Sequence, residues 1–227
     1  MQLITATSTL PDFTVIFSPE IDLSDMRREI AFSSISATNS IPNITATANS
    51  FQVGRTGQQP KTVSLPIGSY DMKAIQRHFK AHAGARLEAN SATFHIVINV
   101  PADTVISFNV PNSIAPVLGF EKDSVLNPGM RSSDHVAKIV PVNTVNVCCD
   151  VVTGSYVDGV LATSLFTFYP DVHPGAKIVK EARQLIYLPF SDSRKEKLSK
   201  IRVSLTDQNN RVIDFRGEPI TVTFFLR

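Results

Sequence analysis

The chain has 227 residues, with 22 Lys and Arg against 20 Asp and Glu, and its formal net charge is +2. Because charged residues make up only 19% of it, against roughly 25% in an average soluble domain, uncharged polar residues must supply much of the surface. Basic residues form no stripe, and no apolar run approaches the roughly 20 residues of a membrane span. We therefore expect no specific nucleic-acid recognition and no membrane-spanning segment.

Two further features concern where the protein is used. The first ten residues lack a cationic start and an apolar core, so no secretory signal peptide is expected. Cys148 and Cys149 are adjacent in an apolar segment, where neighbouring strand side chains point to opposite faces. A disulfide between them would be strained, which predicts two buried thiols. We expect a protein made and used inside a cell, or released as part of an assembly.

In chain order, the first quarter predicts short strands separated by Pro, Asn, Ser and Gly, at residues 12–17, 29–36, 44–53 and 61–65. A helix follows near residues 70–83. Ser69 or Asp71 can cap its N-terminus, Ile75 and Phe79 belong to its apolar stripe, and Gly84 ends it. Residues 92–100 and 104–110 then predict a hairpin.

The segment from Glu121 to Asp134 is rich in Asn, Pro, Gly, Arg and Ser, which predicts a long surface loop and a candidate domain boundary. After it, strands are predicted at residues 136–140, 144–152, 161–169, 176–179 and 184–188. The C-terminus alternates apolar and polar residues over 201–205 and again over 220–226, so the chain ends inside a strand. About twelve short strands and one helix predict an all-β fold, an antiparallel β-sandwich or jelly roll.

No group of residues predicts catalysis. His78 and His82 have the spacing of a metal pair on a helix, but no third ligand is evident, so no metal site is expected. Asp171 and His173 lie in a proline-flanked loop that predicts a turn. No phosphate-binding loop or cofactor motif occurs, and we expect no enzyme activity. Asn43 begins a glycosylation triplet, which has little meaning without a secretory signal.

Several sequence blocks, in their order along the chain, resemble proteins encoded by Polinton-like and adintovirus-like elements. They are Gly68-Ser69-Tyr70, Asn112-Ser113-Ile114 with Leu118-Gly119-Phe120, Val147-Cys148-Cys149-Asp150 with Gly154-Ser155, Phe168-Tyr169-Pro170-Asp171-Val172 with Pro174-Gly175, Leu185-Ile186-Tyr187-Leu188-Pro189, and Leu205-Thr206-Asp207-Gln208 with Asp214-Phe215-Arg216-Gly217-Glu218. The resemblance covers roughly residues 60–227.

The resemblance implies a penton-type minor capsid protein, a single jelly roll that forms a homopentamer at the vertices of a virion. Its partners would be further copies of itself and a major capsid protein, and it would be made in the cytoplasm or nucleus of a host cell. The implied division is an N-terminal set of strands or an arm at 1–60 and a jelly-roll body at 61–227, with one continuous domain as the alternative.

The predicted loop supplies the candidate interface residues, because loops and edge strands make contacts between subunits. They are Glu121, Lys122, Asp123, Asn127, Arg131 and Asp134. The alternative function is a receptor- or glycan-binding β-sandwich of a viral spike or fibre. Such a module would expose aromatic rings at one end of the sandwich.

Overall fold

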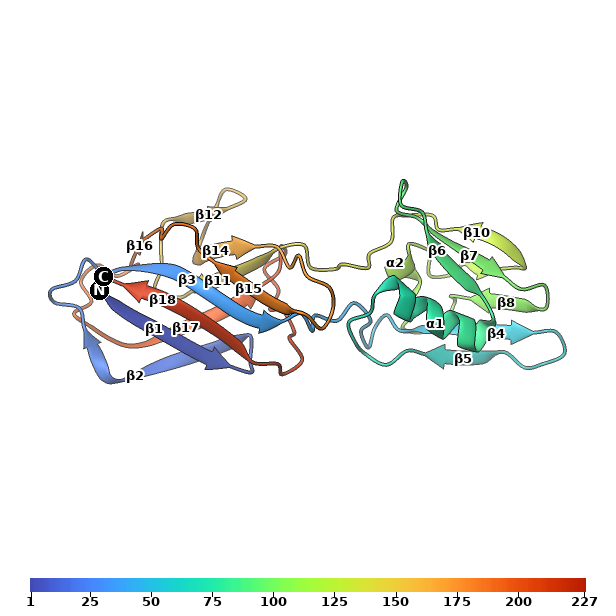
Figure 1. Cartoon of the computed structure of the whole chain (residues 1–227), viewed down its shortest axis with the longest axis horizontal. Helices are drawn as coiled ribbons and strands as arrows, with labels where there is room; N and C mark the ends of the chain where they lie inside the picture. The colour runs from blue at the N-terminus through green and yellow to red at the C-terminus, as the bar shows by residue number, and fades with distance from the viewer. The chain divides into compact units, whose positions relative to one another are not determined.

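The computed structural model describes residues 1–227 and divides them into two compact units (Figure 1). Unit 1 consists of Met1–Ile41 and Val142–Arg227, and unit 2 consists of Pro42–Pro141, which is inserted between them in the sequence. A proline thus stands at each end of the insert. Each unit has its own hydrophobic core.

Unit 1 is a sandwich of two antiparallel sheets, one with the strand order β1-β18-β3-β15 and β16 beside β3, the other with the order β14-β11-β17-β2. A separate hairpin joins β12 to β13. The bounds are β1 (Gln2–Ser8), β2 (Asp12–Asp22), β3 (Glu29–Thr38), β11 (Val145–Cys149), β12 (Ser155–Val157), β13 (Val160–Ala162), β14 (Ser164–Phe168), β15 (Lys177–Glu181), β16 (Leu188–Pro189), β17 (Lys197–Thr206) and β18 (Ile220–Leu226).

The pairing of unit 1 is nested. Among its eight principal strands, β1 pairs with β18, β2 with β17, β3 with β15, and β11 with β14, so the first strand meets the last and the fourth meets the fifth. A ribbon of nested antiparallel pairs that wraps into two facing sheets is a jelly roll. The predicted all-β sandwich is confirmed, and unit 2 occupies the connection between its third and fourth strands.

The core of unit 1 follows from the alternation seen in the sequence. Along β18 the side chains of Ile220, Val222, Phe224 and Leu226 are fully buried, and those between them are half-buried. In β17, Ile201, Val203 and Leu205 are buried on every second position, and the buried Leu198 precedes them across an irregularity in the strand. Phe32 of β3 stacks on the half-buried Phe166 of β14 with ring centroids 4.1 Å apart. The predicted C-terminal strand is therefore confirmed as part of the core.

Unit 2 has two smaller sheets, with the strand orders β5-β4-β8-β9 and β10-β7-β6, and two helices. Its elements are β4 (Ser50–Arg55), β5 (Lys61–Ser64), α1 (Met72–Ala83), β6 (Arg86–Ala89), β7 (Ile96–Val100), β8 (Thr104–Ser107), α2 (Ala115–Leu118), β9 (Val125–Leu126) and β10 (Gly129–Ser132).

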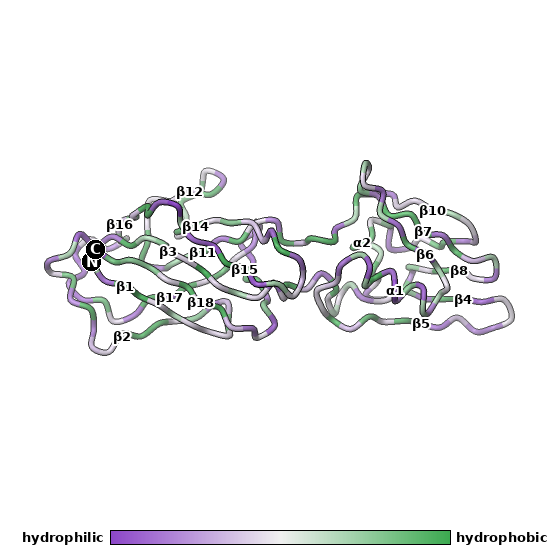
Figure 2. Tube along the Cα trace, viewed as in Figure 1, coloured by the Kyte–Doolittle hydropathy of each residue, from purple (hydrophilic) through white to green (hydrophobic).

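The predicted helix is confirmed as α1. The Asp71 carboxylate accepts a hydrogen bond from the backbone N–H of Ala74 at 2.7 Å, and Gly84 ends the helix with a φ of 64°. Phe79 stacks on Phe51 of β4 with ring centroids 4.1 Å apart, which fixes the helix on the sheet. Figure 2 shows hydrophobic residues only in short stretches, and neither helix is long and apolar enough to cross a membrane.

Three expectations about local structure are wrong. β7 and β8 form no hairpin, because β7 pairs with β6 and β10 whereas β8 pairs with β4 and β9. The turn after Pro101 carries the chain from one sheet to the other. Residues 136–140 contain no strand, and the segment from Glu121 to Asp134 is no continuous loop, because it contains β9 and β10. β1 and β6 are strands that the sequence did not predict.

The division expected at residue 60 does not match the two units. Residue 60 lies in the turn between β4 and β5, which pair with each other, so no boundary falls there. Residues 1–41 are no separate arm, since they supply three of the principal strands of the jelly roll. The chain leaves unit 1 at Ile41 and returns to it at Val142.

Candidate assembly surfaces and a cationic pocket

The two ends of the predicted interface segment meet in unit 2. The backbone N–H of Glu121 donates to the Asp134 carboxylate at 3.2 Å, and the Glu121 carboxylate lies 2.8 Å from Nε2 of His135. The His135 backbone N–H donates to the carbonyl of Gly119, whose φ is 81°. A Cβ at Gly119 would lie 2.1 Å from the His135 carbonyl oxygen, so only glycine allows this approach.

The six candidate interface residues are all exposed, but they do not form one cluster. Glu121, Lys122 and Asp123 line a surface groove of about 360 Å³ beside α2, and Asp134 is tied to Glu121. Asn127 lies between β9 and β10, and Arg131 lies on β10. The structure therefore brings four of the predicted residues together and places the other two along a sheet edge.

β10 is an open sheet edge. It pairs with β7 on one side only, and all four of its residues are exposed, with Met130 at 69%. An unpaired strand edge offers backbone N–H and C=O groups to another chain. The sequence did not predict this edge, because Pro128 directly precedes the strand and Gly129 is its first residue, and both residue types are typical of turns.

The β12–β13 hairpin of unit 1 carries an apolar surface. Asp158 and Gly159 form its two-residue turn with positive φ values of 50° and 79°, which suit a tight hairpin. Tyr156 and Leu161 lie opposite each other in register and are 70% and 57% exposed, and Val160 is also exposed. The hairpin leads into β14, an edge strand, and lies beside it.

A shallow apolar groove lies between β1, an edge strand of one sheet, and β2, an edge strand of the other sheet. Its volume is about 450 Å³, and no charged residue lines it. Val15 and Phe17 of β2 form one wall, and Leu3 of β1, 61% exposed, lies on the other. Within unit 1, Figure 1 places β12 near the top of the view and β2 at the bottom. The hairpin and the groove thus belong to opposite edges of one sandwich.

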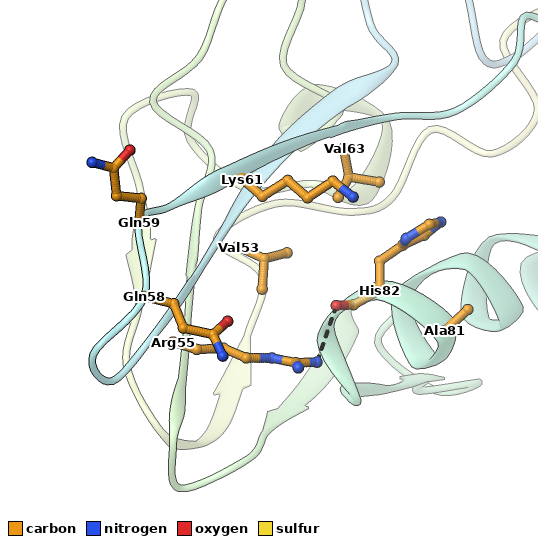
Figure 3. Close-up of a pocket in the computed structure, with 8 residues that line it drawn as sticks. All are labelled: Val53, Arg55, Gln58, Gln59, Lys61, Val63, Ala81 and His82. Atoms are coloured by element: carbon orange, nitrogen blue, oxygen red, sulfur yellow. Dashed lines mark hydrogen bonds between the residues drawn. The ribbon is translucent and has the colours of Figure 1, made fainter.

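Unit 2 has a pocket of about 290 Å³ between the β4–β5 hairpin and the end of α1 (Figure 3). Arg55 and Lys61 extend into it from the hairpin, and the His82 side chain lies on the helix side. Arg55 Nη2 donates to the backbone carbonyl of His82 at 3.5 Å. Two glutamines and two buried valines complete the lining with Ala81, and no carboxylate belongs to it.

Buried polar side chains hold the chain where it passes between the units. In unit 2, the Asn43 amide donates to the carbonyls of Tyr70 and Ile139, each at 2.8 Å, and accepts from the Tyr70 N–H at 2.9 Å. Asn43 therefore connects the segment that enters unit 2 with the segment that leaves it. Because its amide is buried and fully hydrogen-bonded, the glycosylation triplet that it begins is a structural feature of the fold.

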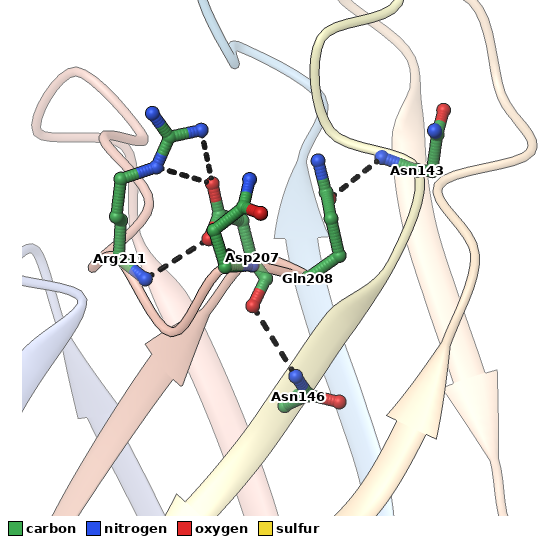
Figure 4. Close-up of polar contacts among 6 residues, drawn as sticks. Asn143, Asn146, Asp207, Gln208 and Arg211 are labelled. Atoms are coloured by element: carbon green, nitrogen blue, oxygen red, sulfur yellow. Dashed lines mark hydrogen bonds and ion pairs between the residues drawn. The ribbon is translucent and has the colours of Figure 1, made fainter. Parts of the chain in front are cut away.

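In unit 1, Asp207 and Gln208 hold the segment with which the chain returns from unit 2 (Figure 4). Its carboxylate accepts hydrogen bonds from the backbone N–H groups of Asn209 and Arg211 and from two nitrogens of the Arg211 guanidinium, all within 2.9 Å. Its carbonyl accepts from the Asn146 amide, and Gln208 accepts from the backbone of Asn143. Burial raises the pKa of Asp207, but the hydrogen bonds from Arg211 outweigh it, and the pKa lies below its ordinary value.

The other singled-out residues are spread over both units. The rings of His78 and His82 lie 6.3 Å apart in unit 2, and no group of three His, Cys, Asp or Glu side chains is placed to hold a metal ion. Asp171, in unit 1, pairs with Lys180 at 2.6 Å. Both cysteines are free thiols, and burial raises the pKa of Cys149 to about 12, so its thiolate is suppressed.

No family model matches this sequence, and no curated protein matches it either. Among solved structures, the mavirus penton protein is similar over 98% of this chain and 97% of its own, with 10% identity and a TM-score of 0.48. A chain of the Sputnik virophage is similar over 98% of this chain and 96% of its own, with 12% identity and a TM-score of 0.48.

Proposed function

We propose that this chain is a structural capsid protein, a penton-like vertex component that assembles into a homopentameric ring and packs against a major capsid protein. It would have no catalytic role and would reside in the virion. The supporting fold is the jelly roll of unit 1, an architecture that viral capsid proteins use. The observation that carries the proposal is the pair of unlike apolar surfaces at opposite edges of this sandwich.

The placement of these surfaces favours a head-to-tail contact between copies. The β12–β13 hairpin leads into β14, and the groove is bounded by β2, the strand at the other end of the same sheet. A contact between two different surfaces is heterologous, and repeating it about an axis closes a ring when the rotation allows it. The hairpin of one copy would enter the β1–β2 groove of the next.

The chemistry of the two surfaces matches. Tyr156, Val160 and Leu161 are uncharged, and so is every residue that lines the groove. Their contact would remove apolar surface from water, worth about 25 cal/mol per Å², provided that the exposed Asp158 carboxylate at the hairpin turn stays in solvent. It would also cover two strand edges that are open in the single chain. Such an assembly should persist in roughly 0.5 M salt, because screening weakens only charge interactions.

The test uses the solution mass from light scattering together with negative-stain images. The unaltered chain should form rings with a mass of about five chains. A hairpin variant, Tyr156→Ser with Leu161→Ser, and a groove variant, Val15→Ser with Leu3→Ser, should each remain monomeric. Ile186→Ser, which removes an equally exposed apolar side chain elsewhere in unit 1, is the control and should still form rings.

Mixing the two variants makes the test sharper. The hairpin variant keeps an intact groove and the groove variant keeps an intact hairpin, so the mixture should stop at heterodimers. Rings that persist in either variant would rule out this contact while leaving the vertex role in place. An unaltered chain that stays monomeric at all concentrations, alone and with a major capsid protein, would instead contradict the vertex role.

A receptor- or glycan-binding sandwich is the second candidate, and the exposed rings of Tyr156 and Tyr169 favour it. Tyr169 directly follows β14, whereas Tyr156 belongs to the hairpin that precedes this strand. Binding of neutral sugars that is lost in Tyr169→Ala would support this second function.

A further inference from the structure

Unit 2 has a concentration of unpaired positive charge. It contains nine Lys and Arg against six Asp and Glu, a net charge of +3, whereas the remainder of the chain has a net charge of −1. None of the five ion pairs in the structure involves a Lys or Arg of unit 2. These cations are therefore available to a ligand.

The charge is concentrated on one side of α1 and at its end. Along the helix, Lys73, Arg77 and Lys80 are spaced by four and three residues, so they share a face, and all three are exposed. The twelve residues of α1 include no Asp or Glu. The pocket that contains Arg55 and Lys61 lies at the C-terminal end of the same helix, where Ala81 and His82 line it.

The lining of the pocket has the chemistry of a site for an anionic sugar. Arg55 and Lys61 offer N–H donors to a sulfate or carboxylate group, and the contact with the His82 carbonyl holds the guanidinium at the pocket wall. Gln58 and Gln59 offer amide donors and acceptors that suit sugar hydroxyls. The buried Val53 and Val63 give the pocket an apolar base for the face of a sugar ring.

We propose that this pocket binds a sulfated polysaccharide. The pocket volume of about 290 Å³ suits a single sugar unit of such a chain. A single-stranded nucleic acid is the less suitable polyanion, because no Phe, Tyr or Trp lines the pocket to stack against bases. This site is independent of ring formation, which the jelly roll of unit 1 would provide.

The experiment measures binding of a heparin-type sulfated oligosaccharide to the full chain by calorimetry. The same oligosaccharide without sulfates and a single-stranded RNA of equal charge serve as the two comparison ligands. The sulfated sugar should bind, the desulfated one should not, and the RNA should bind at least tenfold more weakly. Lys61→Gln should weaken sulfated-sugar binding about tenfold, the effect of one lost charged hydrogen bond.

Arg131→Gln is the matched control, because it removes one positive charge from the same unit on β10 and outside the pocket. It should change the affinity less than twofold. Lys80→Gln is a second control, because it removes a positive charge from α1 outside the pocket lining, and it should also change the affinity less than twofold. Equal binding of RNA, an unchanged affinity in Lys61→Gln, or no binding of the sulfated sugar would each overturn the proposal.

Discussion

The two units expose opposite kinds of surface. Unit 1 forms four Lys and Arg ion pairs and exposes apolar side chains at the open edges of its sandwich, whereas none of the nine Lys and Arg side chains of unit 2 forms an ion pair. The four Lys and Arg ion pairs of the structure all lie in unit 1: Lys180 with Asp171, Arg202 with Asp12, Arg211 with Asp207, and Arg227 with Glu29. The two proposals therefore differ in chemistry, with an apolar contact between copies at unit 1 and an anionic ligand at unit 2.

The two units are also stabilised separately. Each has a separate core, so damage to one should leave the other folded. Hydrogen exchange read by mass spectrometry reports the two units separately, which a single unfolding midpoint cannot do. Exchange measured in each unit therefore tests whether the two units unfold independently.

The largest loss is expected from Gly119→Ala in unit 2. The substitution forces a residue with a side chain into a positive φ and drives Cβ into the carbonyl of His135. Left-handed strain and overpacking together should lower the free energy of unfolding of unit 2 by about 4 kcal/mol. Gly57→Ala is the control: it has a similar φ but no neighbour within 4 Å, and it should cost about 1 kcal/mol. Equal exchange rates in both variants would contradict this account.

Asn43→Ala should destabilise unit 2 by about 3 kcal/mol, because it leaves buried backbone groups of Tyr70 and Ile139 without partners. Protection from exchange should fall in unit 2 and remain unchanged in the jelly roll. Asn109→Ala, at an exposed position, should have almost no effect. Faster exchange in both units after Asn43→Ala would show that they do not unfold independently.

In unit 1, Asp207→Asn should lower the free energy of unfolding by about 2 kcal/mol, through the loss of charge-assisted hydrogen bonds from Arg211. The pKa of Asp207 is lowered in the folded state, so its stabilisation is present above the unfolded pKa and is lost as the pH falls through the folded one. The difference between the unaltered chain and the variant should therefore shrink below about pH 4.

Chemical denaturation of unit 1 across this pH range measures that difference. Asp25→Asn, which alters an exposed aspartate, is the control and should leave stability unchanged at every pH. A gap between the unaltered chain and Asp207→Asn that stays constant down to pH 2 would show that the charge of Asp207 does not stabilise the fold.

The sequence predicted those elements whose signals are local. Asp71 directly precedes helix α1 and caps it, and Gly84 directly follows the helix and ends it. In β18, apolar buried residues alternate strictly with half-buried ones. The unit boundary could not be predicted in this way, because β1 meets β18 across nearly the whole chain and no local signal records that pairing. The cationic pocket was also missed, since β5 and most of α1 separate Arg55 from His82 in the sequence.

The smallest stability change is expected at β10, where the predicted interface segment crosses a sheet edge. Met130→Ser and Arg131→Gln alter exposed side chains on a strand paired on one side only, so each should shift stability by less than about 0.5 kcal/mol. If this segment lies at a subunit interface, Met130→Ser should still weaken ring formation, because it removes an apolar side chain from the contact without unfolding unit 2. Light scattering of Met130→Ser, with Ile186→Ser as the control, shows whether β10 takes part in ring formation. Rings of unchanged stability in Met130→Ser would place assembly in unit 1 alone.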